Sequence, residues 1–314
     1  MIAVLGARGF IGAAVVRELK AMGRAVCGTV SPRSDCPTDD DEYFAIDLAD
    51  NPERLGDWLR ARGVRGVIHA AFPPRTLLAT AIDEVDVQAQ AIDRAVIDAC
   101  RRCSSLRAVV LVSSGAVYGD RRGSGPGAVT EDQALLPSGR YGEIKLAQER
   151  RWNDANLDLE VILARPFNIT GPGEPTTLVA AAFVKRMKES PGAPLTVRNS
   201  ESIRDFVDVR DVGAALACLV TQPAGAYNIA SGIPTSVGDL ARRLALIGRT
   251  ADILAPDGRG GDSWSCGDSS KLFASTGWRR RYTLEDSLHA VWSEASAGES
   301  VAAPALRTVP RIAS

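Results

Sequence analysis

The stretch Gly6-Ala7-Arg8-Gly9-Phe10-Ile11-Gly12 decides the fold, because it follows the apolar run Ile2–Leu5 directly and opens a helical pattern. In this GxxGxxG spacing, Gly6 permits a tight turn, Gly9 lets the backbone approach a pyrophosphate, and Gly12 allows close helix–strand packing. The helix start adds free N–H groups and a partial positive charge. The stretch therefore predicts a dinucleotide site, with an ordinary glycine-rich turn as the alternative. The residues expected to contact the dinucleotide here are Gly6, Arg8, Gly9, Phe10, Ile11 and Gly12.

Short apolar runs alternate with helical patterns through the first 165 residues. The expected strands are Ile2–Leu5, Ala25–Val30, Tyr43–Ile46, Gly66–His69, Ala108–Ser113 and Leu159–Ala164. The expected helices are Phe10–Met22, Pro52–Arg62, Thr76–Arg102 and Arg140–Asn156. Several strands are unbroken runs of Val, Ile and Leu, which are typical of a parallel sheet covered on both faces. The pattern predicts the α/β class, with a Rossmann fold: a doubly wound parallel sheet with right-handed crossovers.

Beyond residue 165 the pattern becomes less regular, with clustered Pro and Gly and shorter helices. We expect residues 1–165 to form the dinucleotide-binding domain and residues 166–294 to form most of a smaller C-terminal, substrate-binding α/β region. Two apolar runs between residues 206 and 230, Phe206–Val209 and Tyr227–Ile229, are expected to return to the main sheet. Residues 295–314 are rich in Ala, Ser and Pro and are expected to form a flexible tail.

Composition and charge exclude several classes of partner. The 314 residues are 45% apolar and 24% charged, as in globular proteins, and the formal net charge is −1. Nucleic acids and anionic membranes bind basic surfaces, so neither is an expected partner. The sequence has no apolar run long enough for a membrane span and opens without a leader pattern, so we expect a cytoplasmic protein.

A metal site is not expected. The sequence contains two histidines, and its six cysteines are scattered apart from the CxxC pair Cys100 and Cys103. Zinc sites of this kind use a second CxxC, and a redox pair would follow a strand and precede a helix; neither context is present. We interpret Cys100 and Cys103 as small packed residues at the end of a helix.

The end of the second expected strand distinguishes between the two nicotinamide dinucleotides. An NAD site places Asp or Glu there to bind the ribose 2′-hydroxyl, but Ala25–Val30 is followed by Ser31 and Arg33. An arginine binds phosphate through its planar fork, so Arg33, together with Arg8, favours a 2′-phosphate. The alternative for Arg8 is stacking on adenine, and the alternative for Arg33 is an ordinary surface position. We predict NADP(H), with NAD(H) as the alternative.

Two further strand ends are expected to contact the cofactor. Asp47 and Leu48 follow the third strand, where a carboxylate can receive the adenine amino group. Ala70 and Ala71 follow the fourth strand, where small residues let the backbone approach the cofactor. His69 before them is interpreted as a packed residue of the strand end.

Tyr141 and Lys145 lie four residues apart in an expected helix, and therefore on the same face one turn apart. Lowering a tyrosine pKa from about 10 to about 7 takes about 4 kcal/mol of preferential stabilisation of the phenolate. The Lys145 ammonium and an oxidised nicotinamide supply positive charge for this, and Lys145 is also expected to hold the nicotinamide ribose. Ser114 follows the fifth strand, at the sheet edge that binds ligands. Ser114, Tyr141 and Lys145 are the expected catalytic residues.

Six segments of the chain resemble the successive motifs of the extended short-chain dehydrogenase/reductase family. They are GARGFIG, SSGAVYG, YGEIK, RPFNITGPG, RDFVDVRDV and YNIASG, and the likeness covers roughly residues 1–290. The pattern is most similar to the nucleotide-sugar branches of that family, the UDP-galactose 4-epimerases and the GDP-4-keto-6-deoxymannose reductases. The resemblance implies a nucleoside-diphosphate sugar as ligand, the trio Ser114, Tyr141 and Lys145 as catalysts, and a homodimer formed through a four-helix contact.

The same resemblance implies a diphosphate-binding set and one excluded reaction. The diphosphate residues are Asn168 in RPFN, Arg204 in IRDF and Arg259, whose alignment crosses a gap. The sugar 4,6-dehydratases of the family carry an Asp–Glu pair where Gly115 and Ala116 stand here, so dehydration is not expected. Asp86 replaces the family's asparagine that supports the active-site helix, which implies a local change in water or helix structure.

Three functions stay open. A net reductase exchanges its cofactor and draws on a largely reduced NADP pool, whereas an epimerase keeps its cofactor bound and generally favours NAD. The missing carboxylate favours reduction of the C4 ketone of a nucleotide-linked deoxy sugar, with Ser114 orienting the carbonyl, Tyr141 protonating the alkoxide and Lys145 tuning Tyr141. A 4-epimerase with tightly bound NAD is the second function. A non-catalytic dinucleotide-binding regulator is the third, disfavoured because Tyr141 and Lys145 are both present.

Overall fold

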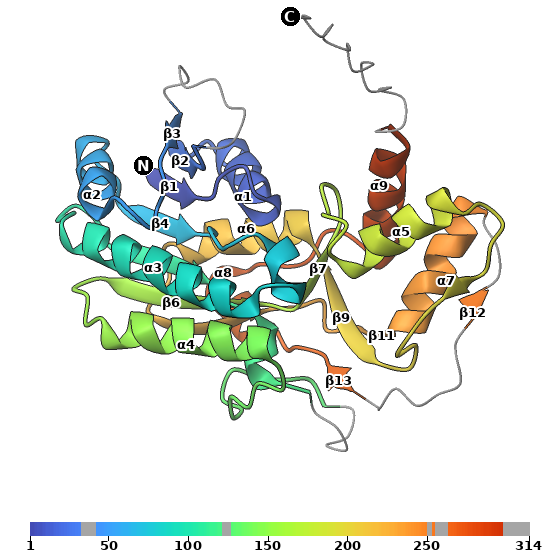
Figure 1. The fold of residues 1–314 in the computed structure, drawn as a ribbon. Coiled ribbons are helices and arrows are strands. Elements are labelled where there is room, and N and C mark those ends of the chain that lie inside the picture. The colour runs from blue at the N-terminus through green and yellow to red at the C-terminus, as the bar shows by residue number, and fades with distance from the viewer. Residues whose placement is uncertain (33–41, 121–126, 250–252, 255–262, 298–314) are drawn as a thin grey trace, which may run out of the picture.

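The computed structural model describes residues 1–32, 42–120, 127–249, 253–254 and 263–297. Its centre is a seven-stranded parallel sheet (Figure 1). In spatial order the strands are β3 (Tyr43–Ala45), β2 (Val26–Val30), β1 (Ile2–Leu5), β4 (Gly66–His69), β5 (Ala108–Val112), β6 (Glu160–Pro166) and β10 (Gly225–Ile229). The winding direction reverses between β1 and β4. The doubly wound Rossmann sheet expected from the sequence is confirmed.

Helices cover both faces of this sheet. On one face, α1 (Phe10–Ala21) and α6 (Val209–Leu219) join their apolar residues to those of the strands in a single core. On the other face lie α2 (Pro52–Ala61), α3 (Ile82–Arg101) and α4 (Arg140–Asp154), which follow one another from top to bottom on the left of Figure 1. Strands covered in this way can be apolar along their whole length, and β5 is buried at each of its positions.

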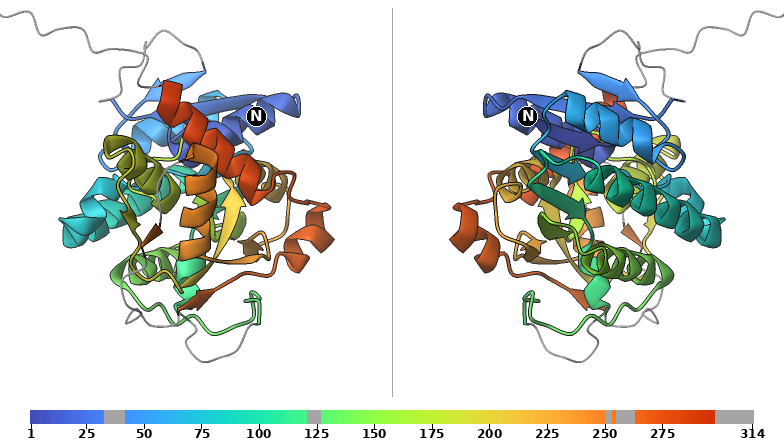
Figure 2. Two further views of the ribbon diagram at one scale, coloured as in Figure 1. Left: turned by 90° about the vertical axis from the view of Figure 1, so that its right-hand side faces the viewer. Right: turned by 90° about the vertical axis from the view of Figure 1, so that its left-hand side faces the viewer.

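A second core lies beside the large sheet. It is formed by α5 (Val179–Glu189), α7 (Val237–Gly248) and α9 (Leu284–Ala297). When the right-hand side of Figure 1 faces the viewer, α7 and α9 come to the front (Figure 2, left). The shorter elements are the strands β7 (Asn168–Thr170), β8 (Leu195–Thr196), β9 (Ile203–Asp208), β11 (Pro234–Ser236), β12 (Ile253–Leu254) and β13 (Trp264–Ser265), the helix α8 (Ser270–Thr276), and the 3-10 turns Arg75–Ala79 and Gly115–Tyr118.

One expected return to the main sheet is wrong. Phe206–Val209 does not join the seven strands, because most of it belongs to β9, which pairs with β7, β11 and β13. β9 ends at Asp208, whose carboxylate accepts a hydrogen bond from the Arg210 backbone and so starts α6. A buried apolar run has the same pattern in either sheet, so the sequence did not separate the two. Tyr227–Ile229 does return, within β10.

The long helix expected over Thr76–Arg102 is divided in the structure. A 3-10 turn at Arg75–Ala79 precedes α3, which begins at Ile82. This start places Asp83 and Glu84 in the first turn of α3, where the helix dipole favours acidic side chains. At the other end of the chain, α9 continues to residue 297, and residues 298–314 of the expected tail lie outside the described residues. None of the described helices is both long and apolar enough to cross a membrane.

Candidate active site

A cavity of about 1070 Å³ opens at the carboxyl ends of the parallel strands. The first turns of α1 and α4, the ends of β5 and β6, and parts of β7 and β9 contribute to its walls. Open α/β sheets bind their ligands at this edge, next to the reversal of strand order. The expected site residues that line the cavity are Gly9, Phe10, Ile11, Ala70, Ser114, Tyr141, Lys145, Asn168 and Arg204.

The glycine turn leaves no room for side chains. Gly6 has a φ of +80°, and a Cβ there would lie 3.0 Å from the Cα of Ala71. A Cβ on Gly12 would overlap the carbonyl oxygen of Gly6. Gly9 is the N-cap of α1, which has no side-chain cap. The helix therefore presents backbone groups to the cavity, and the turn fits the pyrophosphate of a dinucleotide.

The adenosine end of the expected cofactor site carries exposed polar side chains. The Arg8 guanidinium lies over the ring of Tyr43, 5.1 Å from the ring centroid. Ser31 is exposed directly after β2. Arg33 lies outside the described residues. Of the two arginines expected to bind a 2′-phosphate, the structure thus describes Arg8, which lies against the first residue of β3.

Of the other expected cofactor residues, three lie near the strand ends where a cofactor is expected and one is buried in the core. Asp47 is exposed, and one of its oxygens accepts a hydrogen bond from the Ala49 backbone at 3.1 Å. Leu48 is buried in the core between the sheet and α2. Ala70 lines the cavity, and the Ala71 backbone lies against the glycine turn. The carboxylate and the two small residues stand where the sequence placed them, whereas the Leu48 side chain faces the core.

Tyr141 and Lys145 both contact the aromatic ring of Phe72. The ring of Tyr141 contacts Phe72 edge to face, with 6.0 Å between centroids. The Lys145 Nζ lies 4.1 Å from the centroid of the same ring, a favourable position for a cation. Lys145 is 4% exposed and donates a hydrogen bond to the Val112 carbonyl oxygen at 2.9 Å. Tyr141 and Lys145 thus contact the same ring, and all three side chains line the cavity.

Ser114 starts the 3-10 turn after β5. Its Oγ accepts a hydrogen bond from the Ala116 backbone at 3.2 Å, which leaves its own proton for another acceptor. Behind this turn, a Cβ on Gly115 would lie 3.1 Å from the Phe167 ring. An acidic side chain of the dehydratase type would be crowded at this position, which agrees with the absence of an acid–base pair.

The two described diphosphate candidates come from neighbouring strands. Asn168 in β7 is the register partner of Phe206 in β9, two residues beyond Arg204. Arg204 lies 3.7 Å from the Asp120 carboxylate and donates to the Ile203 carbonyl oxygen at 2.8 Å. Arg259 lies outside the described residues.

Sequence reasoning missed three residues around the cavity. Phe72 follows the small residues at the end of β4, and Asp120 follows the SSGAVYG segment, so both stood next to recognised motifs. Gln148 comes three residues after Lys145, on the same helix face, and accepts a hydrogen bond from Nζ at 2.9 Å. The spacing of three residues between Lys145 and Gln148 could have indicated this contact, but the sequence does not show which further residue the Gln148 amide binds.

The unusual Asp86 links two helices. One of its oxygens accepts from Arg140 at the start of α4 at 2.9 Å, and the other from Gln90 at 3.0 Å. A charged contact between α3 and α4 therefore stands where the family has an asparagine.

Cys100 and Cys103 are free, buried thiols at the end of α3. Burial raises the pKa of Cys100 to about 12, which makes it a poor nucleophile and a poor metal ligand. Within the described ranges, no group of three or more His, Cys, Asp and Glu side chains is placed to hold a metal ion.

The model of the NAD dependent epimerase/dehydratase family matches residues 2–230. The chain belongs to this family. It is an NAD(P)-dependent enzyme of the oxidoreductase or epimerase type. This epimerase/dehydratase family member is similar to a GDP-6-deoxy-D-mannose reductase of Pseudomonas aeruginosa, with 33% identity over 198 residues, 58% of this chain and 64% of that protein.

Two further proteins are similar to this chain over nearly its whole length. The dTDP-6-deoxy-L-talose 4-dehydrogenase (NAD(P)(+)) of Kitasatospora kifunensis is 27% identical over 316 residues, 94% of this chain and 95% of that protein. The solved structure of RMD from Pseudomonas aeruginosa, complexed with NADPH, is 25% identical with a TM-score of 0.77 and covers 95% of this chain and 99% of that one.

Proposed function

We propose that the chain uses NADP(H) to reduce the 4-keto group of a nucleoside-diphosphate deoxy sugar, with Tyr141 as the proton donor. The observation that carries this proposal is the shared cavity, into which the start of α1 and the Tyr141–Lys145 pair both open. The substrate class is supported by the names of two relatives, a GDP-6-deoxy-D-mannose reductase and a dTDP-6-deoxy-L-talose 4-dehydrogenase. The second name places its reaction at position 4.

Each residue of the trio has one role in the proposed step. NADPH, when bound, supplies the hydride. The Ser114 hydroxyl donates a hydrogen bond to the ketone oxygen and orients it. The Tyr141 hydroxyl gives its proton to that oxygen as negative charge develops there, and the Lys145 ammonium stabilises the phenolate that is left. Phe72 packs against both side chains and keeps them adjacent.

NADP(H) is the preferred cofactor in this proposal. β2 carries no carboxylate that could bind a ribose 2′-hydroxyl, and Ser31 follows it. Arg8 presents an exposed guanidinium at the same edge, and a guanidinium binds phosphate well. Fluorescence titration is expected to give a lower Kd for NADPH than for NADH, and Arg8→Gln is expected to narrow the difference. Equal Kd values in the wild-type chain would contradict the preference.

The sugar nucleotide is proposed to lie in the cavity, against the paired strands β7 and β9. The Asn168 amide and the Arg204 guanidinium stand on paired strands and both line the cavity, so they can share the oxygens of one diphosphate. Arg259 is the third proposed diphosphate residue, on the sequence pattern alone. Arg204→Gln is expected to raise KM for the sugar nucleotide about 10-fold or more while leaving the Kd of NADPH unchanged.

The test is a panel of 4-keto and 4-hydroxy nucleotide sugars, with NADPH consumption and product NMR. A reductase oxidises one NADPH per product, and an epimerase interconverts isomers without net consumption. Tyr141→Phe is expected to lower kcat at least about 100-fold with cofactor binding intact. Tyr282→Phe is the matched control, because Tyr282 packs under Arg210 and does not line the cavity. Equal turnover by Tyr141→Phe and wild type would refute the mechanism.

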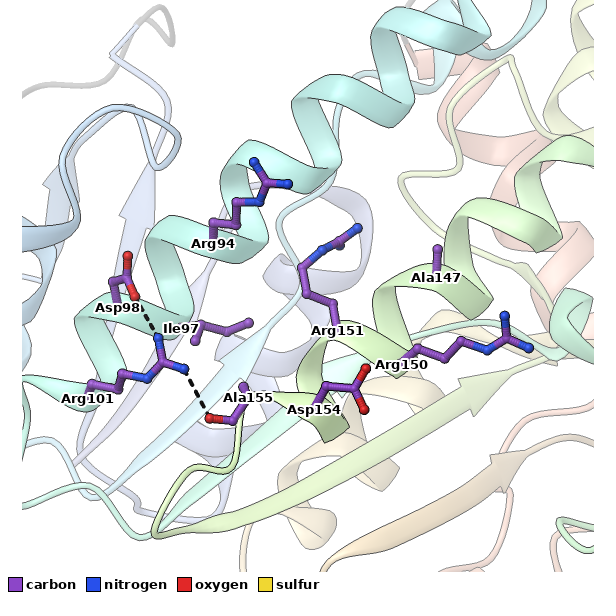
Figure 3. A pocket seen from close by; sticks show the side chains of 9 residues that line it. All are labelled: Arg94, Ile97, Asp98, Arg101, Ala147, Arg150, Arg151, Asp154 and Ala155. Carbon is purple, nitrogen blue, oxygen red and sulfur yellow. Dashed lines mark hydrogen bonds and ion pairs between the residues drawn. The ribbon is translucent and has the colours of Figure 1, made fainter.

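We also propose that the chain forms a homodimer through α3 and α4. These helices lie side by side and border a groove of about 540 Å³, called here the α3–α4 groove (Figures 1 and 3). Its side chains are Arg94, Ile97, Asp98, Arg101, Ala147, Arg150, Arg151, Asp154 and Ala155. The groove is basic, whereas the first turn of α3 carries Asp83 and Glu84. A twofold contact with antiparallel helices would place each acidic turn on the partner's basic groove.

Light scattering tests the dimer directly. The wild-type chain is expected to have twice the monomer mass, and Arg94→Glu with Arg150→Glu is expected to return it to the monomer. Arg60→Glu, on the exposed face of α2, is the control for a charge reversal outside the groove. A monomeric wild-type chain at micromolar concentration would contradict this contact.

A further inference from the structure

A buried chain of hydrogen bonds leads from Lys145 to the outer surface of the molecule. Lys145 Nζ donates to Gln148 Oε1 at 2.9 Å, and Gln148 Nε2 donates to Asp93 Oδ1 at 2.7 Å. Arg151 donates to the other oxygen of Asp93, and its side chain borders the α3–α4 groove (Figure 3). Gln148 is 2% exposed and Asp93 is 0% exposed. Neither lines the cavity, so neither meets the reacting atoms.

Asp93 is held as an anion inside the protein. Burial opposes its ionisation, but the adjacent His69 and hydrogen bonds from Gln148 and Trp152 keep the pKa of Asp93 below its usual value. Trp152 Nε1 donates to Oδ1 at 3.1 Å, and His69 Nε2 lies 3.5 Å from the same oxygen. A buried carboxylate needs such partners to stay charged. The charge of Asp93 is therefore a fixed feature of the region behind Lys145.

The anion sets the direction of the Gln148 amide. A carboxylate only accepts hydrogen bonds, so the amide must turn its NH₂ group toward Asp93. Its oxygen then faces Lys145, which only donates. The reversed amide would place its oxygen against a carboxylate and its NH₂ group against an ammonium, and both contacts would be repulsive. The contacts of Gln148 thus have one stable arrangement, in which the amide oxygen accepts from Nζ.

We propose that Asp93 and Gln148 are positioning residues for Lys145. The Asp93 anion orients the Gln148 amide, and the amide oxygen holds the ammonium at the cavity wall beside Phe72. From that position the ammonium stabilises the Tyr141 phenolate. This inference rests on the proposed function, in which Tyr141 is the proton donor.

The need for such a residue follows from the lysine side chain. Four flexible bonds precede Nζ, and the ammonium is a compact charge with no preferred plane. One carbonyl acceptor, that of Val112, fixes its distance from β5, and Gln148 supplies a second, from α4. The charged or titratable side chains in contact with this arrangement include Asp93 of α3, His69 of β4 and Arg151 of α4.

Gln148→Met removes both hydrogen bonds at nearly constant volume. The first measurement is the ultraviolet absorbance of the Tyr141 phenolate, taken as the difference between each protein and its Tyr141→Phe counterpart, without cofactor or substrate. We expect Gln148→Met to raise the apparent pKa of Tyr141 by about one pH unit. The second is turnover: kcat is expected to fall about 10-fold to 100-fold, and the alkaline limb of ketone reduction to move to higher pH.

Trp152→Phe is the matched control, because it removes a different hydrogen bond to the same carboxylate and leaves Gln148 in place. It is expected to lower the unfolding midpoint without moving the Tyr141 titration. Asp93→Asn, which no longer fixes the amide direction, is expected to move that titration the same way as Gln148→Met and supplies a second variant should Gln148→Met fold poorly. An unmoved titration in Gln148→Met or Asp93→Asn overturns the positioning role. A wild-type chain inactive on the sugar panel counts against the proposed function alone.

Discussion

The buried ion pair between Arg165 and Glu149 gives the sharpest stability prediction. Its side chains are 5% and 2% exposed, and the guanidinium donates to both oxygens of the carboxylate, at 2.9 and 2.7 Å. A third donor nitrogen binds the Tyr118 hydroxyl at 2.8 Å. Burial by itself would lower the pKa of the Arg165 guanidinium. Its hydrogen bonds and ion pair with Glu149 outweigh this and raise the pKa of Arg165 above its ordinary value. The carboxylate also accepts from Ser113, the residue before Ser114.

Arg165→Met leaves the Glu149 carboxylate buried without its cation. Breaking a buried pair in this way costs about 3–5 kcal/mol of unfolding free energy. Removing both charges with Arg165→Met and Glu149→Leu together is expected to cost less than the single change, since well-packed apolar residues often replace buried pairs at little cost. Arg60→Met breaks a pair whose side chains are 58% and 67% exposed, and is expected to cost at most about 1 kcal/mol.

Urea unfolding measures these differences as shifts of the midpoint at constant slope. The expected order of stability is wild type and Arg60→Met first, the double variant next, and Arg165→Met last. A cost below about 1 kcal/mol for Arg165→Met would refute the reasoning, because it would equal that of an exposed pair. A double variant less stable than Arg165→Met would show that the uncompensated charge of Glu149 is not the cause.

Three further predictions concern the glycine turn, a buried carboxyl and a buried thiol. Gly12→Ala is expected to weaken NADPH binding at least about 100-fold in a fluorescence titration, because its Cβ would overlap the Gly6 carbonyl, whereas Gly127→Ala, in open space, should bind normally. Burial raises the pKa of Glu174 above 4.5, so its ionised form costs stability in the folded chain. The stability of the wild type relative to Glu174→Gln is therefore expected to be greatest below about pH 4.5 and to decline as the pH rises through the raised pKa; a difference independent of pH in urea titrations would contradict this. Cys100, with its pKa raised to about 12, is expected to resist iodoacetamide in the native chain and to react in the unfolded chain, and mass spectrometry of native protein showing its alkylation would count against the burial.

The sequence predicted those parts of the molecule whose structure depends on residues close together in the chain. The glycine turn, the order of strands and helices, and the Tyr141–Lys145 face of α4 each depend on neighbours within a few residues. The division of Thr76–Arg102 was missed because a 3-10 turn and an α-helix have similar apolar periods. The placement of Phe206–Val209 was missed because two buried sheets use the same residue types.

The contacts that complete the site depend on residues far apart in the chain. Gln148 contacts Asp93, 55 positions earlier in the chain, and Arg204 of β9 contacts Asp120, which follows the 3-10 turn Gly115–Tyr118. The residue types do not indicate such pairs, because amides and carboxylates such as Gln148, Asp93 and Asp120 are common in polar helices and loops. Phe72 is intermediate, because its position after β4 was visible in the sequence but its contact with both Tyr141 and Lys145 was not.

The strand β9 has a mechanical consequence for substrate exchange. It carries Arg204 into the cavity and ends at Asp208, which starts α6 without an intervening loop. α6 in turn packs so closely on α1 that a Cβ on Gly213 would lie 2.8 Å from the backbone of Ala14. Arg204 and α1 therefore belong to one closely packed unit, and we expect opening of the cavity to come from the loops around it rather than from a rotation of one layer against the other.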